Sequence, residues 1–337
     1  MISPRQLVAA LCALVPAITL VVVATASPAE AAPPPYVALG DSYSSGVGTR
    51  SYLNDGTSCQ RSIYAYPSLL AAQKGYTLDF RACSGATVAD VTNTQLASLS
   101  AATRYVSISV GGNDAGFADV LTECALPGWA SNCNGAINNA QNIINNTLPG
   151  RLSALYSSIR GRATVATVVV VGYPRIFMGE DCNAFTWFSP SEESRLNQTA
   201  DLLNSKLAAA AAAQGFGFAN PTSRFIGHAV CDSPEWLNGL SNPVSESYHP
   251  NRTGQSAGYA PLVSPLLTGA PARISAAVVA RAAGSAGALA AQQRKYAALD
   301  RTIEPKLFRA PDLHSARVRA AAKAHGIDLE RWIAQHT

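Results

Sequence analysis

The segment Thr164–Val171 reads Thr-Val-Ala-Thr-Val-Val-Val-Val, and every residue in it except one alanine is β-branched. Successive side chains of a strand point to opposite faces of its sheet. Because this run is apolar at almost every position, both of its faces would be buried. Burial on both faces is typical of a strand at the centre of a parallel sheet that is covered by helices. The segment therefore predicts an α/β fold.

Strands and helices alternate along the rest of the chain. We expect further strands at Tyr36–Leu39, Thr77–Arg81, Tyr105–Val110 and Gly217–Asn220. We expect helices at Ser68–Lys74, Ala136–Arg160, Pro190–Ala213 and Thr253–Leu267, with Pro149 as a candidate break in the second. This alternation predicts a parallel sheet with helices on both faces.

Composition and charge narrow the class of protein. The chain has 337 residues, of which 48% are hydrophobic and 14% charged, which excludes a wholly disordered chain. Residues 36–267 hold 13 basic and 15 acidic side chains, whereas residues 268–337 hold 11 basic and 5 acidic ones. Because the basic surplus lies in the tail, nucleic-acid binding by the main body is disfavoured.

The N-terminus has the pattern of an export signal. A positive start at Met1–Arg5 precedes an apolar stretch, Leu7–Ala24, and small residues at Ala29–Ala32. These features predict a secretory signal peptide over residues 1–32, cleaved near its end, and a secreted protein. The alternative is an uncleaved membrane anchor, but Pro16 interrupts the apolar stretch.

Six cysteines remain after the predicted cleavage, and an even number in an exported chain indicates three disulfides. A structural zinc site is disfavoured because the chain has no Cys-x-x-Cys or His-x-x-x-His spacing, and we expect no metal. Many pairings are compatible with the sequence. We favour the sequential one, in which each bond closes a loop: Cys59–Cys83, Cys124–Cys133 and Cys182–Cys231.

Chemically useful residues follow three of the predicted strands. Gly40–Ser42 follows the first strand, Ser84–Gly85 the second and Gly111–Asp114 the third. Ligands of parallel sheets bind beyond the carboxyl ends of the strands. Ser42 is a candidate nucleophile beside a helix N-terminus, although a serine there also commonly caps a helix. Asn113 could donate its amide to an oxyanion, although asparagine is also an ordinary turn residue.

A serine nucleophile needs a base, and the main body has two histidines, His228 and His249. His249 lies in the loop Glu246–Gly254, directly before the last predicted helix of the body. His228 has small and apolar neighbours, and we interpret it as a packed or surface residue. His249 is therefore the candidate base.

Taken together, these motifs resemble the SGNH (GDSL-type) hydrolases. The four residues that name the family fall, in order, on Ser42, Gly85, Asn113 and His249. The resemblance covers about Tyr36 to Leu267 and is closest to secreted bacterial esterases and lipases with three disulfides, which supports the sequential pairing. It implies a flavodoxin-like three-layer α/β/α fold with a central parallel sheet and a catalytic domain over residues 33–267.

The resemblance also implies a mechanism without metal or cofactor. Ser42 would attack an ester carbonyl while His249 takes its proton, and the Ser42 N–H, the Gly85 N–H and the Asn113 amide would hold the oxyanion. The expected substrates are acyl esters of lipids or small esters. The alternatives are a phospholipase A-type activity on phospholipid acyl esters, and a carbohydrate acetyl esterase or cell-wall-directed member of the same fold.

One position departs from the family pattern. The family places an aspartate three residues before the histidine, and this chain has Glu246 there. Some relatives instead orient the histidine with a main-chain carbonyl, which here would be that of Ser247. Both residues are candidate orienters of His249, and we slightly favour the carbonyl.

The substrate surface and the tail are less well determined by sequence. Candidate residues for an acyl-binding surface share an aromatic or large apolar side chain in a predicted loop: Phe117, Leu126, Trp129, Phe177, Phe185, Trp187, Phe188 and Trp236. Residues 268–337 lie outside the resemblance, and we expect an Ala-rich, basic extension that is helical or partly disordered and dispensable for activity. We expect a monomer that contacts a lipid interface transiently.

Overall fold

The central sheet is parallel, as predicted. The structure is a computed structural model that describes Met1 and residues 32–337. Within residues 32–337, five strands form one sheet in the order β2-β1-β3-β4-β5. Their bounds are Pro35–Gly40 for β1, Thr77–Phe80 for β2, Tyr105–Ser109 for β3, Thr167–Val171 for β4 and Gly217–Ala219 for β5. The predicted signal peptide lies outside the described residues, apart from Met1 and Ala32.

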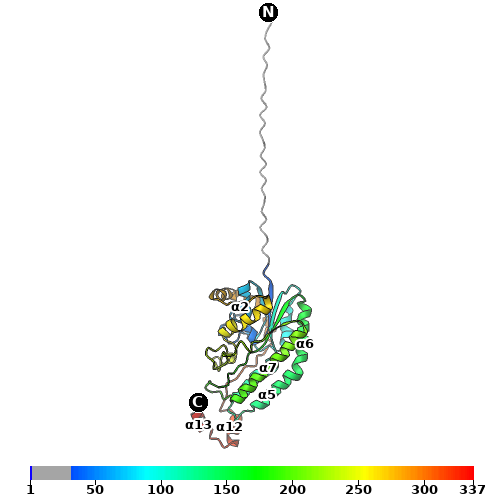
Figure 1. Cartoon of the computed structure of the whole chain (residues 1–337). Coiled ribbons are helices and arrows are strands. Elements are labelled where there is room, and N and C mark those ends of the chain that lie inside the picture. Colours follow the sequence, from blue (N-terminus) through cyan, green and yellow to red (C-terminus); the bar gives the residue numbers. More distant parts are fainter. Residues whose placement is uncertain (2–31) are drawn as a thin grey trace. The chain divides into compact units, whose positions relative to one another are not determined.

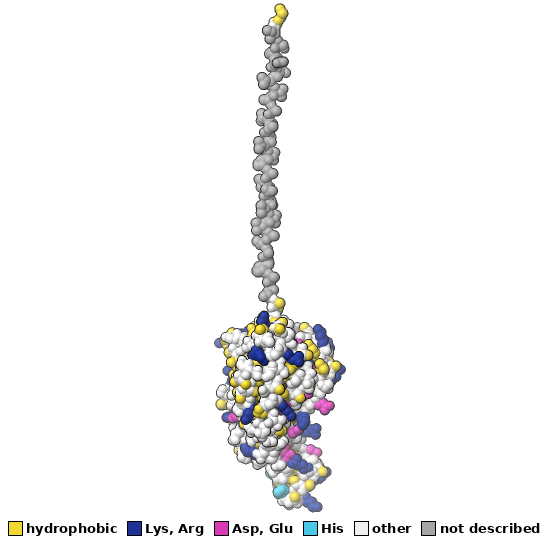
Figure 2. Space-filling model, turned by 90° about the vertical axis from the view of Figure 1, so that its right-hand side faces the viewer, with side chains coloured by type: hydrophobic (Ala, Val, Ile, Leu, Met, Phe, Trp, Pro, Cys, Tyr) yellow, Lys and Arg dark blue, Asp and Glu magenta, His cyan; other side chains and the backbone are white. Residues whose placement is uncertain are grey.

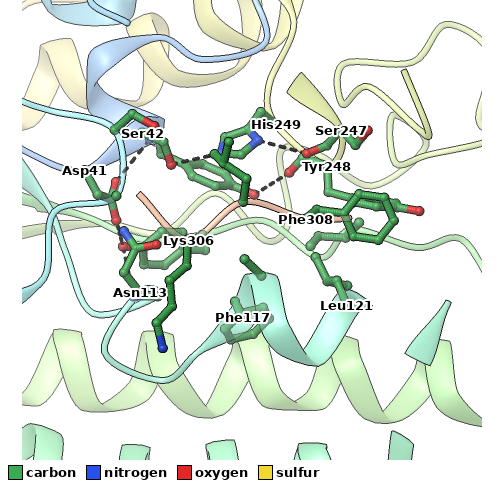
Figure 3. Close-up of a pocket in the computed structure, with 18 of the residues that line it drawn as sticks. Asp41, Ser42, Asn113, Phe117, Leu121, Ser247, Tyr248, His249, Lys306 and Phe308 are labelled. Carbon is green, nitrogen blue, oxygen red and sulfur yellow. Dashed lines mark hydrogen bonds between the residues drawn. The ribbon is translucent and has the colours of Figure 1, made fainter. Parts of the chain in front are cut away.

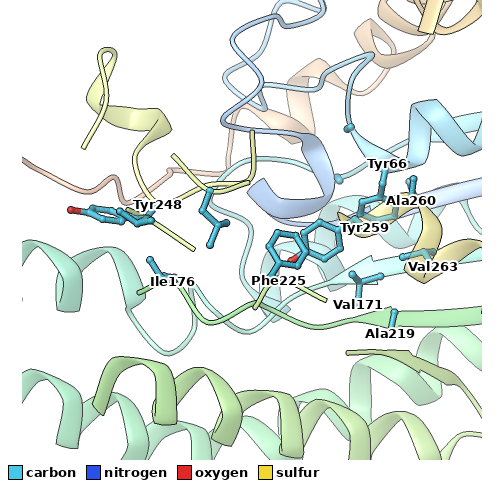
Figure 4. Close-up of a cluster of buried hydrophobic side chains, with 14 of the residues drawn as sticks. Tyr66, Val171, Ile176, Ala219, Phe225, Tyr248, Tyr259, Ala260 and Val263 are labelled. Atoms are coloured by element: carbon cyan, nitrogen blue, oxygen red, sulfur yellow. The ribbon is translucent and has the colours of Figure 1, made fainter. Parts of the chain in front are cut away.

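Strand β4 begins three residues later than predicted. The Ala166 N–H donates to the Ala163 carbonyl at 3.1 Å, so residues 164–166 belong to the turn after a helix and not to the strand. Thr167 is exposed, and from Val168 onward the strand is buried on both faces. Val168 and Val170 lie in one apolar cluster, and Val169 and Val171 lie in the other (Figure 4).

Helices cover both faces of the sheet and complete a three-layer α/β/α fold. The helices of the body that do so include α2 (Tyr66–Lys74), α5 (Cys133–Asn142), α6 (Leu148–Arg162), α7 (Pro190–Ala213) and α8 (Ala260–Thr268). Helices α5, α6 and α7 lie along one side, and α2 lies on the other side (Figure 1). Helix α8 packs on β4, on β5 and on α2.

Shorter helical segments connect the layers. They are α1 (Ser42–Ser45), α3 (Val88–Asp90), α4 (Phe117–Cys124), the π-helical turns Val91–Gln95, Ile143–Thr147 and Gly254–Tyr259, and the 3₁₀ turns Leu96–Ser98 and Val244–Glu246. The predicted helix over residues 136–160 is divided into α5 and α6, with Pro149 in the first turn of α6. Proline suits a first turn because its missing N–H would have no helical partner there.

The six cysteines pair in sequential order in the structure. Cys59–Cys83 joins the loop after α1 to the loop after β2. Cys124–Cys133 joins the end of α4 to the start of α5. Cys182–Cys231 joins the loop that precedes α7 to the irregular segment after β5.

The tail differs from the expected separate extension. Residues 33–337 form one compact unit, so residue 268 marks no boundary between units. The tail contains α9 (Ala276–Gly284), α10 (Ala286–Arg294), α11 (Ala297–Asp300), α12 (Ala316–Ala324) and α13 (Leu329–His336). Helix α9 packs on α2, and α10 packs on β2.

A buried ion-pair cluster joins the tail to the body. The Asp300 carboxylate contacts the Arg61 guanidinium at 2.6 Å and the Arg81 guanidinium at 2.9 Å, and all three side chains have 0% exposure. Arg61 also contacts Asp55 at 2.7 Å, whereas Arg81 has Asp300 as its ion-pair partner. The body therefore carries buried positive charge that a tail residue neutralises, and this contact explains why the tail is not a separate unit.

The positive charge of the tail is partly neutralised at the surface too. Lys306 pairs with Asp119 at 3.3 Å, and Arg317 pairs with Glu123 at 2.5 Å. On the face seen in Figure 2, basic side chains are scattered and lie among acidic ones at the lower end. Across the part of the chain that the structure describes, no helix is both long enough and apolar enough to span a bilayer.

Replacement of Asp300 tests whether the tail stabilises the body. Asp300→Ala should lower the free energy of unfolding by about 3–5 kcal/mol, because it leaves buried arginine charge uncompensated. Urea denaturation followed by circular dichroism measures this change. The matched control is Asp201→Ala, which removes the partly exposed pair with Arg175 and should cost less than about 1 kcal/mol. Equal losses in the two variants would contradict the role given to Asp300.

Candidate active site

Ser42 stands at the first position of α1, directly after β1, and Asp41 holds it there. The Asp41 carboxylate accepts hydrogen bonds from the Tyr43 N–H at 3.1 Å, from the Ser109 hydroxyl at 2.6 Å and from the Tyr173 hydroxyl. These donors come from α1, from the end of β3 and from the segment after β4. Asp41 therefore connects the carboxyl ends of three strands beneath the serine.

Burial and a close backbone contact shape the same turn. Burial raises the pKa of Asp41 to about 6, while the hydrogen bonds from Ser109 and Tyr173 act in the opposite direction. Gly40 has φ +118°, and a Cβ atom there would lie 2.2 Å from the Ser109 carbonyl oxygen. Only glycine fits at this position, because the turn before Ser42 passes directly against β3.

Ser42 and His249 form a hydrogen-bonded pair (Figure 3). The Ser42 Oγ lies 2.9 Å from His249 Nε2, and His249 Nδ1 lies 2.9 Å from the Ser247 carbonyl oxygen. A carbonyl oxygen can only accept, so Nδ1 carries the hydrogen and Nε2 is left as the acceptor of the serine proton. Burial lowers the pKa of His249 to about 4, which keeps the ring neutral at pH 7.

Tyr43 and Asn238 position the histidine loop. The Tyr43 hydroxyl donates to the Tyr248 carbonyl at 2.8 Å, and the Tyr43 ring lies 5.3 Å from the His249 ring. The Asn238 N–H donates to the His249 carbonyl at 2.9 Å. Because Tyr43 belongs to α1, the helix that carries Ser42 also holds the backbone beside His249.

Glu246 does not contact His249. Its carboxylate accepts a hydrogen bond from the Tyr52 hydroxyl at 2.6 Å and lies 3.6 Å from the Arg50 guanidinium. Of the two candidate orienters, the structure therefore brings the Ser247 carbonyl to His249 and turns the Glu246 carboxylate toward a different loop.

Gly85 and Asn113 line the same cleft as Ser42 and His249. The Asn113 side-chain amide donates to the Ala86 carbonyl at 3.0 Å. This bond uses one of the two amide hydrogens and fixes the orientation of the amide. Gly85 has φ +84°, a conformation that favours glycine. The four residues that sequence reasoning singled out are thus brought to one site.

The cleft beside the Ser42–His249 pair is mainly apolar. Its walls include Phe117 and Leu121 of α4, Ile176, Leu203 of α7 and Phe308 of the tail. Among the eight residues proposed for an acyl-binding surface, Phe117 lines this cleft. The other seven pack elsewhere or face solvent: Leu126, Trp129, Phe177, Phe185, Trp187, Phe188 and Trp236.

Sequence reasoning missed several residues of the cleft, among them the wall residues Leu121, Ile176 and Leu203, Tyr173, and three residues of the tail. Tyr173, which donates to Asp41, lies two residues after β4, and applying the carboxyl-end rule to the fourth strand would have found it. Lys306, Leu307 and Phe308 come from the tail, where no motif marks them.

His228 lies outside the cleft, as its sequence context indicates. Its ring stacks on Trp236 with 3.7 Å between the ring centroids. Within residues 32–337, no group of three or more His, Cys, Asp or Glu side chains is arranged to hold a metal ion.

Comparison with known proteins agrees with this fold. The model of the GDSL-like lipase/acylhydrolase family matches residues 38–257. Lipase 1 of Streptomyces coelicolor is 46% identical over 72% of this chain and 90% of its own length. The lipase of Streptomyces rimosus is 46% identical over 68% of this chain and 85% of its own length.

Two solved structures of Streptomyces enzymes are also similar to this chain. Phospholipase A1 from Streptomyces albidoflavus aligns with TM-score 0.66 and 44% identity, covering 69% of this chain and 99% of that one. The extracellular lipase of Streptomyces rimosus aligns with TM-score 0.65 and 43% identity over the same shares. The extent of the family match and the identity to these relatives show that the chain belongs to the GDSL-like lipase/acylhydrolase family, the SGNH hydrolases.

Proposed function

We propose that this protein is a secreted serine ester hydrolase in which Ser42 is the nucleophile and His249 is the general base. One observation carries the proposal: Ser42 Oγ lies 2.9 Å from a ring nitrogen of His249 that has no hydrogen of its own. This geometry allows proton transfer as the oxygen attacks. Membership in a family of acylhydrolases supports the reaction class.

The reaction has two halves. The Ser42 oxygen adds to the ester carbonyl while its proton passes to His249 Nε2, and the resulting imidazolium is stabilised by the Ser247 carbonyl at Nδ1. His249 then gives the proton to the leaving alcohol, and the acyl group remains on Ser42. A water molecule, activated by His249 in the same way, releases the carboxylic acid and restores the serine.

We assign the negative charge that develops on the carbonyl oxygen to three hydrogen-bond donors. They are the Ser42 N–H, the Gly85 N–H and the Asn113 amide, all of which border the cleft. Loss of one such donor typically raises the barrier by about 2.7–4 kcal/mol. Asn113 should therefore matter almost as much as the serine and histidine.

The cleft favours esters with an apolar acyl group. Phe117, Leu121 and Leu203 offer an apolar surface next to the nucleophile, which suits an acyl chain better than a sugar ring. The relatives named lipase and the phospholipase A1 support lipid esters as substrates, and phospholipid acyl esters are the second candidate. The signal pattern over residues 1–32 and the extracellular relative support secretion.

Hydrolysis of p-nitrophenyl butyrate tests the proposal. Ser42→Ala should abolish it, and Asn113→Ala should reduce kcat about 10²–10³-fold, because the transition state loses a donor. His228→Ala is the matched control and should keep wild-type activity, since its ring lies outside the cleft. Wild-type protein that hydrolyses neither this ester nor a triacylglycerol or phospholipid would refute the proposal.

The pH profile of Glu246→Gln tests the orienting group. Because the Ser247 carbonyl contacts His249 and Glu246 does not, this variant should keep kcat within about two-fold of wild type. His249 must be neutral to accept a proton, so in both proteins the titration of His249 should lower kcat/KM near pH 4 and not near pH 6.5. Asp41→Asn removes the carboxyl whose pKa is about 6 and separates its titration from that of His249. A 100-fold lower kcat in Glu246→Gln would assign the orienting role to its carboxylate.

A further inference from the structure

A tail segment crosses the cleft that holds Ser42 and His249. We call this segment, Glu304–Arg309, the strap. Lys306, Leu307 and Phe308 of the strap line the cleft together with the catalytic pair. Figure 3 shows Lys306 and Phe308 across the cleft from α4, whose Phe117 and Leu121 lie below them.

The strap is anchored just before it begins. Asp300 makes the buried ion pairs with the arginines of the body. The Arg301 guanidinium donates to the Gly56 carbonyl at 3.1 Å. Ile303 is 2% exposed and belongs to the apolar cluster that contains Val168 and Val170 of β4.

The strap is also anchored to α4, on the far side of the cleft. Lys306 pairs with Asp119 at 3.3 Å, and the Arg309 N–H donates to the Thr122 hydroxyl at 3.0 Å. The Arg317 guanidinium then makes two hydrogen bonds to the Glu123 carboxylate, at 2.6 and 2.5 Å. Because the strap is held on both sides of the cleft, we interpret it as a fixed wall and not as a hinged lid.

Beyond Arg317, the C-terminal helix adds an aromatic contact. Trp332 of α13 packs against Trp129 and Trp187, with 5.4 Å between ring centroids in each pair. Two of the aromatic residues first considered for acyl binding therefore hold the tail in place instead.

The backbone of the strap closes the cleft beside Gly85. A Cβ atom on Gly85 would lie 2.4 Å from the Pro305 Cα. The strap is therefore in direct contact with Gly85, whose N–H we assign to the oxyanion.

Phe308 forms the apolar end of this wall. Its side chain is 6% exposed, and its ring packs edge-on against Tyr248, with 4.9 Å between ring centroids. The cavity bounded by the strap, α4 and the Ser42–His249 pair has a volume of about 80 Å³. Pockets that enclose drug-sized ligands have roughly 300–1,000 Å³. With Phe308 in place the cavity is small for a long acyl chain.

The wall lies outside the part of the chain that its relatives share. The family match ends at residue 257, and the phospholipase A1 structure aligns over 69% of this chain while 99% of its own length is covered. We propose that the strap is the outer wall of the acyl-binding cleft and that Phe308 is the residue that limits acyl-chain length. This inference rests on the proposed ester hydrolysis at Ser42.

The test is the chain-length profile of the full-length Phe308→Ala variant. We would measure kcat/KM for p-nitrophenyl esters from acetyl to dodecanoyl. Removing the ring should raise the ratio of dodecanoyl to butyryl kcat/KM about 10-fold or more, since shape changes in an apolar pocket act on this scale. Phe308→Leu, which restores an apolar side chain, should lie between the two.

Leu313→Ala is the matched control. Leu313 is a buried tail residue, 8% exposed, that does not line the cleft. This variant loses a similar apolar contact of the tail and should keep the wild-type profile.

Each outcome has one meaning. An unchanged profile in Phe308→Ala overturns the inference, and so does a parallel change of all esters, which would indicate a gate or general destabilisation. If the wild-type protein hydrolyses none of the esters, the proposed function fails first. Wild-type activity with an unshifted Phe308→Ala profile leaves the proposed function standing and rejects only the role of Phe308.

Discussion

The site depends on the Asp41 carboxylate, which is buried where three strands end. Its hydrogen bonds from Tyr43, Ser109 and Tyr173 hold the first turn of α1 against β3 and β4. Because α1 carries Ser42, and because its Tyr43 also holds the backbone beside His249, one small network positions both Ser42 and His249. The parallel sheet provides the frame, since it brings the carboxyl ends of its strands to a common edge.

The tail contributes side chains to the same cleft. Asp300 neutralises arginines that the body buries, and this contact places the following residues across the cleft. The residues that follow include Lys306, Leu307 and Phe308, which line the cleft. The family fold carries the chemistry, and a segment outside the family match shapes the cavity around it.

Periodicity and strand-end motifs predicted the sheet and the residues that meet at its edge. The run Thr164–Val171 predicted the buried strand, and Ser42, Gly85, Asn113 and His249 all border one cleft. Residues at the carboxyl ends of the strands are predictable because a parallel sheet brings those ends together, whatever the conformation of the loops. The sequence favoured the Ser247 carbonyl as the orienter of His249 only slightly, and the structure agrees with that choice. The preference was slight because the direction of the Glu246 carboxylate depends on Tyr52, nearly two hundred residues earlier.

The packing of the tail on the body could not be predicted from the sequence for a related reason. Its alanine-rich helices have few large apolar side chains, so they resemble a loosely attached extension. The tail is attached by the packing of α9 on α2 and of α10 on β2, and by contacts of Asp300, Ile303 and Trp332 that no periodic pattern reveals. The aromatic residues illustrate the same limit, because Trp129 and Trp187 are covered by the tail.

The most direct test of the account is covalent labelling of the full-length protein with a p-nitrophenyl alkylphosphonate, followed by peptide mass spectrometry. The phosphonate stands in for the tetrahedral intermediate and reacts with an activated serine. The account predicts one adduct, on Ser42, together with loss of ester hydrolysis, and no adduct in His249→Ala over the same time. An adduct on another residue, or full inactivation without modification of Ser42, would contradict it.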